Sequence, residues 1–297
     1  VWAPDSMRRF LTDTPFAITG LMNWWLVFKH QDYFESFGRP PLLQHTWSLG
    51  VEAQYYLLWP LILYFVLKVF GKKVIPTAAL SIATISGAAL FLASIRADIS
   101  STQDVSHVYF GTDTHSIGLF LGSALAVSWI PQNLRINIEK RAQDFIDFIG
   151  VFGLLGILAS FLFIQEADPT AYRIAFPLVG IFGSAIIMSI VHPASRFAPL
   201  LQHPFLVWIG ERSYAIYLWH WIVFQVTRPA QDLTGSTWAL YLFRILVVFA
   251  LADISLRYIE LPVRRGVVSY WLKGLKYRTL QEKKAHTDRK STRLNPV

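Results

Sequence analysis

Apolar segments long enough to cross a bilayer recur along the chain, joined by short polar connections. By length, we predict seven membrane spans, at about 48–70, 76–95, 114–130, 145–165, 172–191, 205–226 and 237–258. A further segment, Thr14–His30, is shorter and is interrupted by Gly20 and Asn23, so we expect an interfacial or re-entrant helix there. The pattern therefore predicts an all-α fold, a polytopic transmembrane helical bundle.

Composition supports this interpretation. Hydrophobic residues make up 54% of the chain and charged residues only 15%, whereas soluble domains carry roughly 25% charged residues. The chain has no cysteine, which excludes a disulfide framework, a thiolate nucleophile and a cysteine metal site. The histidines form neither an HxxxH nor an HExxH pattern, so we predict no metal site. We expect the lipid bilayer, and no nucleic acid, as a partner.

The distribution of lysine and arginine predicts the orientation in the membrane. Basic residues gather in the connections around 68–73, 135–141, 196 and 264–276, while the opposite connections carry isolated arginines. Because cytoplasmic loops are enriched in Lys and Arg, we assign the first set of connections to the cytoplasm. We expect a multi-pass membrane protein.

The segment HTWSLGVEAQYYLLWP places an acid, Glu52, near the beginning of a long apolar run. Helical spacing aligns Ser48, Glu52 and Tyr56 on one face, with Tyr55 and Trp59 beside them. An ionisable group within a membrane span must face protein or a wet cavity, which makes Glu52 a functional candidate. The alternative is a structural carboxylate that only ties neighbouring helices together.

A second polar segment is GTDTHSIGLFLGSALA. It sets Asp113 and His115 at the outer mouth of a helix and then places Gly118, Gly122 and Ala126 one turn apart. Such a stripe of small residues lets another helix approach closely. His115 could serve the reaction or simply be exposed to solvent.

The third polar segment, SYAIYLWHW, places Tyr214, Tyr217 and His220 within one helix. A neutral imidazole at this depth could be catalytic, or it could donate to a backbone carbonyl as a structural group. In the last span, Asp253 and Arg257 have the i, i+4 spacing of a local ion pair, for which we favour a structural role.

In their order and separations, these three segments resemble the acyltransferase 3 family of bacterial membrane O-acyltransferases, over residues 1–265. The resemblance implies a ten-helix enzyme that transfers an acyl group, usually acetyl, from acetyl-CoA or another acyl-CoA to a hydroxyl of an envelope glycan such as O-antigen, peptidoglycan or exopolysaccharide. The acyl-CoA would be a co-substrate, with no tightly bound cofactor. A separate extracytoplasmic acyl-accepting partner or a C-terminal domain is a further expectation.

The family's first helix carries a histidine held to be essential for transfer, and no residue of this chain matches its motif. We therefore expect an N-terminally truncated fragment, seven spans of ten, that is inactive by itself. Glu52 could orient the catalytic base, and Tyr55, Tyr56 or Tyr217 could bind the thioester or carry the acyl group. His220 completes the catalytic candidates. The candidates for the substrate path are His45, Trp47, Ser48, Asp113, His115 and Tyr214.

The C-terminal end divides into two expected parts. Residues 266–287 read as a cytoplasmic polar tail or linker, and residues 288–297 resemble a translated sequencing adapter, although a genuine basic tail would look similar. Two other functional classes remain open. Glu52, Asp253 and the histidines could form the proton relay of a proton-coupled transporter, or the chain could be a membrane scaffold without catalysis.

Overall fold

The computed structural model describes residues 4–30, 40–96, 106–164, 171–229, 232–233, 235–267, 270–271 and 274. These residues are predominantly helical and contain no β-strand, apart from an isolated bridge between Pro229 and Leu233. They form two compact units, residues 1–207 and residues 208–297, and the boundary falls within α11 (Pro204–Val226). The predicted all-α class is confirmed.

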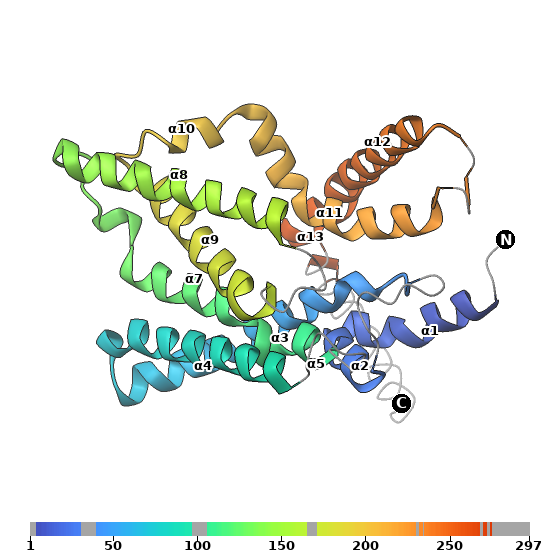
Figure 1. Ribbon diagram of the computed structural model, residues 1–297, viewed down its shortest axis with the longest axis horizontal. Helices are drawn as coiled ribbons and strands as arrows, with labels where there is room; N and C mark the ends of the chain where they lie inside the picture. The colour runs from blue at the N-terminus through green and yellow to red at the C-terminus, as the bar shows by residue number, and fades with distance from the viewer. Residues whose placement is uncertain are drawn as a thin grey trace, which may run out of the picture. The chain divides into compact units, whose positions relative to one another are not determined.

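Unit 1, residues 1–207, is built from helices of very different lengths (Figure 1). The long ones are α1 (Pro4–Thr19), α3 (Trp47–Val69), α4 (Ile75–Arg96), α7 (Ile117–Ser128), α8 (Lys140–Phe163) and α9 (Phe176–Val191). The short ones are α2 (Met22–Phe28), α5 (Ser106–Phe110), α6 (Thr112–His115) and α10 (Ala198–Leu201). Single turns complete the set: η1 (Gln44–Thr46), η2 (Lys72–Val74), η3 (Pro131–Asn133) and the π-helical η4 (Ala171–Ala175).

In the part of the chain that the structure describes, five helical segments are long and apolar enough to cross a membrane: Gln44–Val69, Lys72–Arg96, Lys140–Phe163, Arg173–Val191 and Thr237–Arg264. They correspond to five of the seven predicted spans. α11 has sufficient length at 23 residues, but Glu211, Arg212 and His220 make it more polar than these five.

The predicted span 114–130 differs from the structure. Gly111 is extended, so α6 begins only at Thr112, and Ser116 separates α6 from the 12-residue α7. Twelve residues rise about 18 Å, which is less than the roughly 30 Å of a bilayer core. This segment therefore forms a short broken helix instead of one continuous span.

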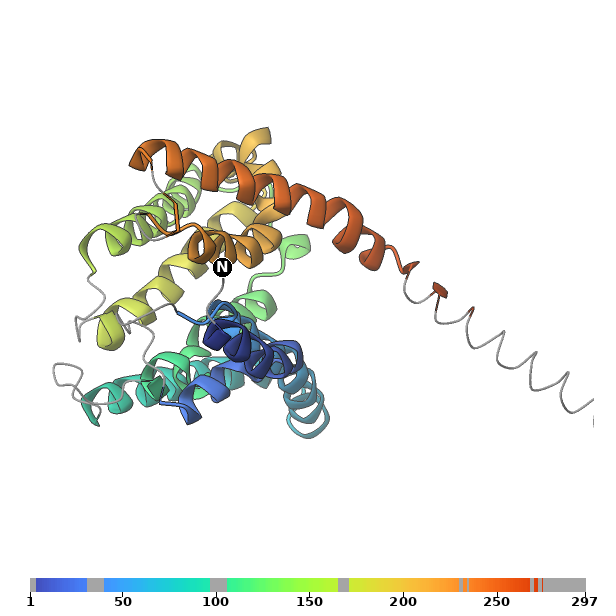
Figure 2. The same ribbon diagram turned by 90° about the vertical axis from the view of Figure 1, so that its right-hand side faces the viewer.

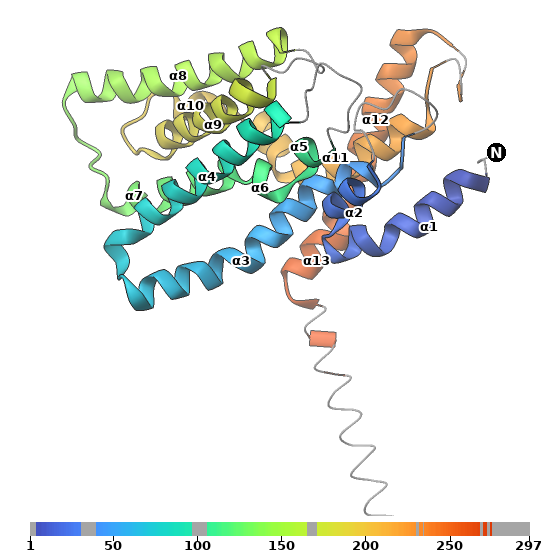
Figure 3. The same ribbon diagram turned by 60° about the horizontal axis from the view of Figure 1, so that its bottom comes forward.

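α4, α7, α9 and α8 pack side by side in that order (Figures 1 and 3). α8 and α9 approach each other closely. A Cβ atom added to Gly153 would lie 2.7 Å from the carbonyl oxygen of Phe182, and one added to Gly156 would lie 2.6 Å from the Phe182 ring. These two glycines allow the helices to touch.

The predicted small-residue stripe on α7 contributes less to helix contact than the glycines of α8 do. A Cβ atom added to Gly118 or Gly122 would meet nothing within 4 Å. A backbone approach comes instead from Gly180 of α9, whose added Cβ would lie 3.4 Å from the Cα atom of Gly118. Sequence spacing alone did not identify the tightest helix pair, because GxxxG spacing permits an approach without selecting the partner.

α1 and α2 form a broken pair beside the beginning of α3 (Figure 1). The predicted break at Gly20 is confirmed, since Gly20 adopts a φ of +71° that favours glycine. The predicted interruption at Asn23 is wrong, because Asn23 lies fully buried inside α2. Met22 and Leu26 of α2 pack with Phe110 in a small apolar core. The interfacial placement of this pair remains a prediction.

Unit 2, residues 208–297, contains most of α11, then α12 (Thr237–Ser255), the π-helical η5 (Leu256–Glu260) and α13 (Leu261–Arg264). α12, η5 and α13 continue as one helical rod (Figure 2). The predicted ion pair between Asp253 and Arg257 is present, at 2.8 Å. Asp253 also accepts two hydrogen bonds from the buried Arg212 of α11, at 2.9 and 2.7 Å, which the sequence did not predict.

Candidate functional site

Glu52 lies on the second turn of α3, where the sequence placed it. Its side chain is half-buried and has no hydrogen-bond or ion-pair partner among the described residues. Ser48, one turn earlier, is also half-buried, whereas Tyr56, one turn later, is 66% exposed. The carboxylate is therefore positioned by its helix alone, with its lone pairs available for a ligand or another group.

Tyr55 is fixed more firmly than Glu52. Its hydroxyl lies 2.6 Å from the hydroxyl of Ser123 on α7. Ser123 donates its own proton to the carbonyl oxygen of Leu119, so Tyr55 must be the donor to Ser123. The Tyr55 ring stacks on Trp59 and meets Phe120 edge-on. Among the tyrosine candidates on α3, Tyr55 joins two helices, whereas Tyr56 is exposed and its ring meets the Tyr55 ring edge-on.

A partly buried polar network that the sequence analysis missed connects α2, α3 and α6 through Gln54, two residues after Glu52 in α3. The Gln54 amide donates to the side-chain oxygen of Asn23, at 2.8 Å, and to the carbonyl oxygen of Gly20, at 2.9 Å. The Gln54 side-chain oxygen accepts from Thr112, at 2.6 Å, and from the indole of Trp24, at 3.0 Å. We call these residues the outer network, because they lie at the end of the spans that charge assigns to the outside.

Asn23 completes the outer network by donating to the Thr112 hydroxyl, at 2.9 Å, and to the carbonyl oxygen of Phe110, at 3.1 Å. The backbones at Gly20 and Gly50 lie close together, which brings Asn23 of α2 within reach of its partners. A Cβ atom added to Gly50 would lie 2.9 Å from the Asn23 side-chain oxygen and 3.0 Å from the carbonyl oxygen of Gly20. A usable sequence signal existed: Asn and Gln within apolar segments need partners.

The substrate-path candidates at the outer end fall into two groups. His115 lies among aromatic rings, with ring-centre distances of 5.1 Å to Trp47, 5.7 Å to Tyr109 and 5.4 Å to Phe176. His45, from η1, is buried. The structure thus gathers Trp47 and His115, as residues of one substrate path would require.

Asp113 belongs to the second, more exposed group. Its carboxylate lies 3.2 Å from Nε2 of His107, and the two side chains are 48% and 45% exposed. The sequence analysis did not single out His107, which comes from α5.

In unit 2, Nδ1 of His220 lies 2.6 Å from the carbonyl oxygen of Tyr217. The N–H group must therefore be at Nδ1, which leaves the lone pair on Nε2. This contact matches the structural alternative, and a neutral Nε2 also suits a base. Tyr214 is 47% exposed.

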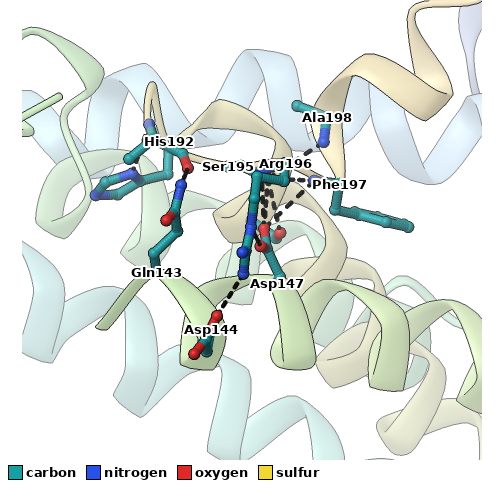
Figure 4. Close-up of polar contacts among 10 residues, drawn as sticks. Gln143, Asp144, Asp147, His192, Ser195, Arg196, Phe197 and Ala198 are labelled. Atoms are coloured by element: carbon teal, nitrogen blue, oxygen red, sulfur yellow. Dashed lines mark hydrogen bonds and ion pairs between the residues drawn. The ribbon is translucent and has the colours of Figure 1, made fainter. Parts of the chain in front are cut away.

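At the predicted cytoplasmic end of unit 1, a second polar cluster joins α8 to the connection between α9 and α10 (Figure 4). One carboxylate oxygen of Asp147 accepts from the backbone N–H of Arg196, at 2.9 Å, and the other accepts from its guanidinium, at 2.7 Å. The guanidinium also binds Asp144. The hydrogen bonds that the guanidinium donates, first to Asp147 and then to Asp144, raise the pKa of Arg196 above its ordinary value. We call these three residues the inner network.

The inner network fixes a loop and offers no obvious catalytic geometry. Asp147 also accepts from the backbone N–H of Phe197, at 3.3 Å, and Gln143 donates to the carbonyl oxygen of Ala194, at 2.8 Å. Arg196 is thus engaged with two acids, so it is poorly suited to bind a phosphate. Among the described residues, no three histidine, aspartate or glutamate side chains cluster to hold a metal ion. The predicted tail is described only at residues 266–267, 270–271 and 274, and 288–297 lie outside the described residues.

Comparison with known proteins identifies relatives over most of the chain. The acyltransferase 3 family model, described as an acyltransferase domain, matches residues 7–257. The peptidoglycan O-acetyltransferase OatA of Listeria monocytogenes is 31% identical over 274 residues, which cover 92% of this chain and 43% of that protein. The O-acetyltransferase OatA of Staphylococcus aureus is 34% identical over 266 residues, covering 89% of this chain and 43% of that protein.

The chain thus spans less than half the length of these curated relatives. No solved structure matches it. The family match extends from α1 to η5 and includes all three motif segments. The chain therefore belongs to the acyltransferase 3 family, and its described residues include several helices long and apolar enough to cross a membrane.

Proposed function

We propose that this protein acetylates hydroxyl groups of a cell-envelope glycan, with peptidoglycan as the acceptor and acetyl-CoA as the donor. The family match and the two O-acetyltransferase relatives support transfer to an envelope glycan. One observation supports a part for this chain in the reaction: the carboxylate of Glu52 lies on an apolar helix and has no hydrogen-bond partner among the described residues. A purely structural carboxylate in such a place would need a partner.

The reaction requires a base because a sugar hydroxyl is a poor nucleophile. The base removes the hydroxyl proton while the oxygen attacks the thioester carbonyl, and the carbon–sulfur bond then breaks to release the thiol of coenzyme A. Glu52 orients the base or a neighbouring hydroxyl toward the acceptor. Tyr55, held by Ser123 at 2.6 Å, is too well anchored to move far, whereas the exposed Tyr56 is free to hydrogen-bond the developing oxyanion.

The substitution Glu52→Gln tests this proposal in the complete protein. It preserves the shape of the side chain and removes its charge, so we expect loss of glycan acetylation with unchanged abundance in the membrane. The measurement is ester-linked acetate released from the purified envelope glycan by mild alkali. Transfer of label from acetyl-CoA to such an ester also separates an enzyme from a transporter, which moves its solute without forming an ester.

Glu139→Gln is the matched control, because Glu139 is exposed at the beginning of α8 and makes no side-chain capping bond. It should acetylate as the unmodified protein does. Normal acetylation in Glu52→Gln would remove Glu52 from the mechanism. Reduced abundance together with reduced acetylation would instead make Glu52 a structural residue.

A further inference from the structure

An exposed surface of unit 1 combines aromatic and polar side chains next to the outer network. Its members are Trp24 and Phe28 of α2, His107 of α5 and Asp113 of α6, and we call it the Trp24 surface. The ring centre of Trp24 lies 6.5 Å from that of Phe28 and 6.2 Å from that of His107. His107 is paired with Asp113 at 3.2 Å. Phe28 is 75% exposed, so the apolar and polar halves are both accessible.

The structure holds this surface in a fixed arrangement. The indole N–H of Trp24 donates to Gln54, at 3.0 Å, and Gln54 is itself tied to Asn23. Asp113 is fixed through its backbone, because its carbonyl oxygen accepts from Ser86 on α4, at 2.7 Å. A binding surface fixed in advance loses less conformational entropy when it takes up a ligand.

The orientation of Trp24 argues against a simple anchor in the membrane interface. Interfacial tryptophans keep the ring in the apolar region and turn the N–H toward water and headgroups. Here the N–H points inward to Gln54, so Trp24 presents ring carbons without a polar handle. The polar groups at the surface are instead those of His107 and Asp113, which stand beside the ring.

This combination matches the chemistry of a sugar. A pyranose ring has an apolar C–H face, which packs on an aromatic ring, and hydroxyl groups at its edge. A carboxylate accepts hydrogen bonds from those hydroxyls, and an imidazole can accept or donate. The negative charge of Asp113 disfavours an anionic ligand at the same place. The surface is therefore suited to a neutral sugar ring.

We propose that the Trp24 surface is a subsite for the acceptor glycan, in which Trp24 and Phe28 contact the face of one neutral sugar and the His107–Asp113 pair binds its hydroxyl groups. This inference rests on the proposed glycan acetylation and adds the residues that bind the acceptor. The subsite lies next to the network that begins two residues after Glu52, so it holds the glycan at the end of the helix that carries the candidate acid.

Binding of chitotetraose, a neutral oligomer of N-acetylglucosamine, to the purified full chain in nanodiscs tests this inference. Isothermal titration calorimetry without donor measures the Kd. We expect Trp24→Ala and Asp113→Ala each to weaken binding about tenfold, the effect of losing roughly 1.4 kcal/mol. Asp113→Ala keeps the test informative if Trp24→Ala misfolds, because the Asp113 side chain is 48% exposed and its substitution leaves the outer network intact.

Trp238→Ala is the matched control, since Trp238 is 83% exposed at the beginning of α12. It should bind chitotetraose as the unmodified chain does, and so should Glu52→Gln. The inference is overturned if the unmodified chain does not bind the sugar, or if Trp24→Ala and Asp113→Ala bind it normally. Sugar binding by Glu52→Gln, with normal acetylation, would refute the role of Glu52 and leave the subsite standing.

Discussion

The outer and inner networks of unit 1 both join separate segments of the chain through side-chain hydrogen bonds, but the chemical groups differ. The outer network joins α2, α3 and α6 through neutral amide and hydroxyl groups, and Asn23 at its centre is fully buried. The inner network joins α8 to a loop through charged groups, and Arg196 and Asp144 are more than half exposed. Neutral groups occupy the buried position because burying a charge costs far more than burying an amide.

The difference in burial predicts a difference in consequence. A buried polar group that loses its partner destabilises the protein by its full desolvation free energy, whereas an exposed group can form a hydrogen bond to water instead. The outer network should therefore decide whether the helices of unit 1 assemble. The inner network should only decide how firmly one loop is held.

The largest effect should follow from Gln54→Leu. This change removes the partner of three partly buried groups, the Asn23 side-chain oxygen, the Thr112 O–H and the Trp24 N–H, so we expect the free energy of unfolding to fall by on the order of 3 kcal/mol. Unfolding in a detergent titration, followed by circular dichroism, measures it. The matched control is Gln143→Leu at the inner end, which loses one hydrogen bond and should cost about 1 kcal/mol. Equal losses in the two variants would contradict the comparison.

A smaller effect should follow from Gly50→Ala. The added methyl group would lie 2.9 Å from the Asn23 side-chain oxygen and 3.0 Å from a backbone oxygen of Gly20. The α2–α3 contact must then open, and overpacking of this kind costs about 2 kcal/mol. The same detergent titration measures the loss.

Gly122→Ala is the control for this prediction. A methyl group at Gly122 would meet nothing within 4 Å, and alanine favours a helix more than glycine does. Gly122→Ala should therefore be neutral or slightly stabilising. If both alanine variants behave alike, the close approach at Gly50 does not hold α2 in place.

The smallest effect should follow from Asp147→Ala at the inner network. The change removes one of the two acceptors of the Arg196 guanidinium and the acceptor of two backbone N–H groups. Because Arg196 can turn to water, we expect less loss of stability than in Gln54→Leu, and faster proteolysis within residues 192–198. Limited proteolysis followed by mass spectrometry measures this. Asp144→Ala, which removes only one exposed contact of Arg196, should leave the cleavage rate nearly unchanged, and equal cleavage in both variants would argue against the central place of Asp147.

The sequence by itself determined the helical class, five of the membrane spans and the Asp253–Arg257 pair, because each depends on residues close together in the chain. In a span, every backbone group is satisfied within its own helix, so apolar length is the main evidence. It was insufficient at 114–130, where the structure has a broken helix. The i, i+4 pair likewise needs only one helix. The family resemblance also came from three contiguous segments, and the family match confirms it.

Only the tertiary structure decided which polar residues meet. Gln54 bonds Asn23 across 31 positions and Thr112 across 58, and Arg212 reaches Asp253 across 41. Hydropathy made Asn23 look like a helix break, since an isolated amide in an apolar segment is unfavourable until its partners are known. The partners of Asn23 come from helices that approach through Gly20 and Gly50, and such an approach depends on packing in space and not on spacing in the sequence.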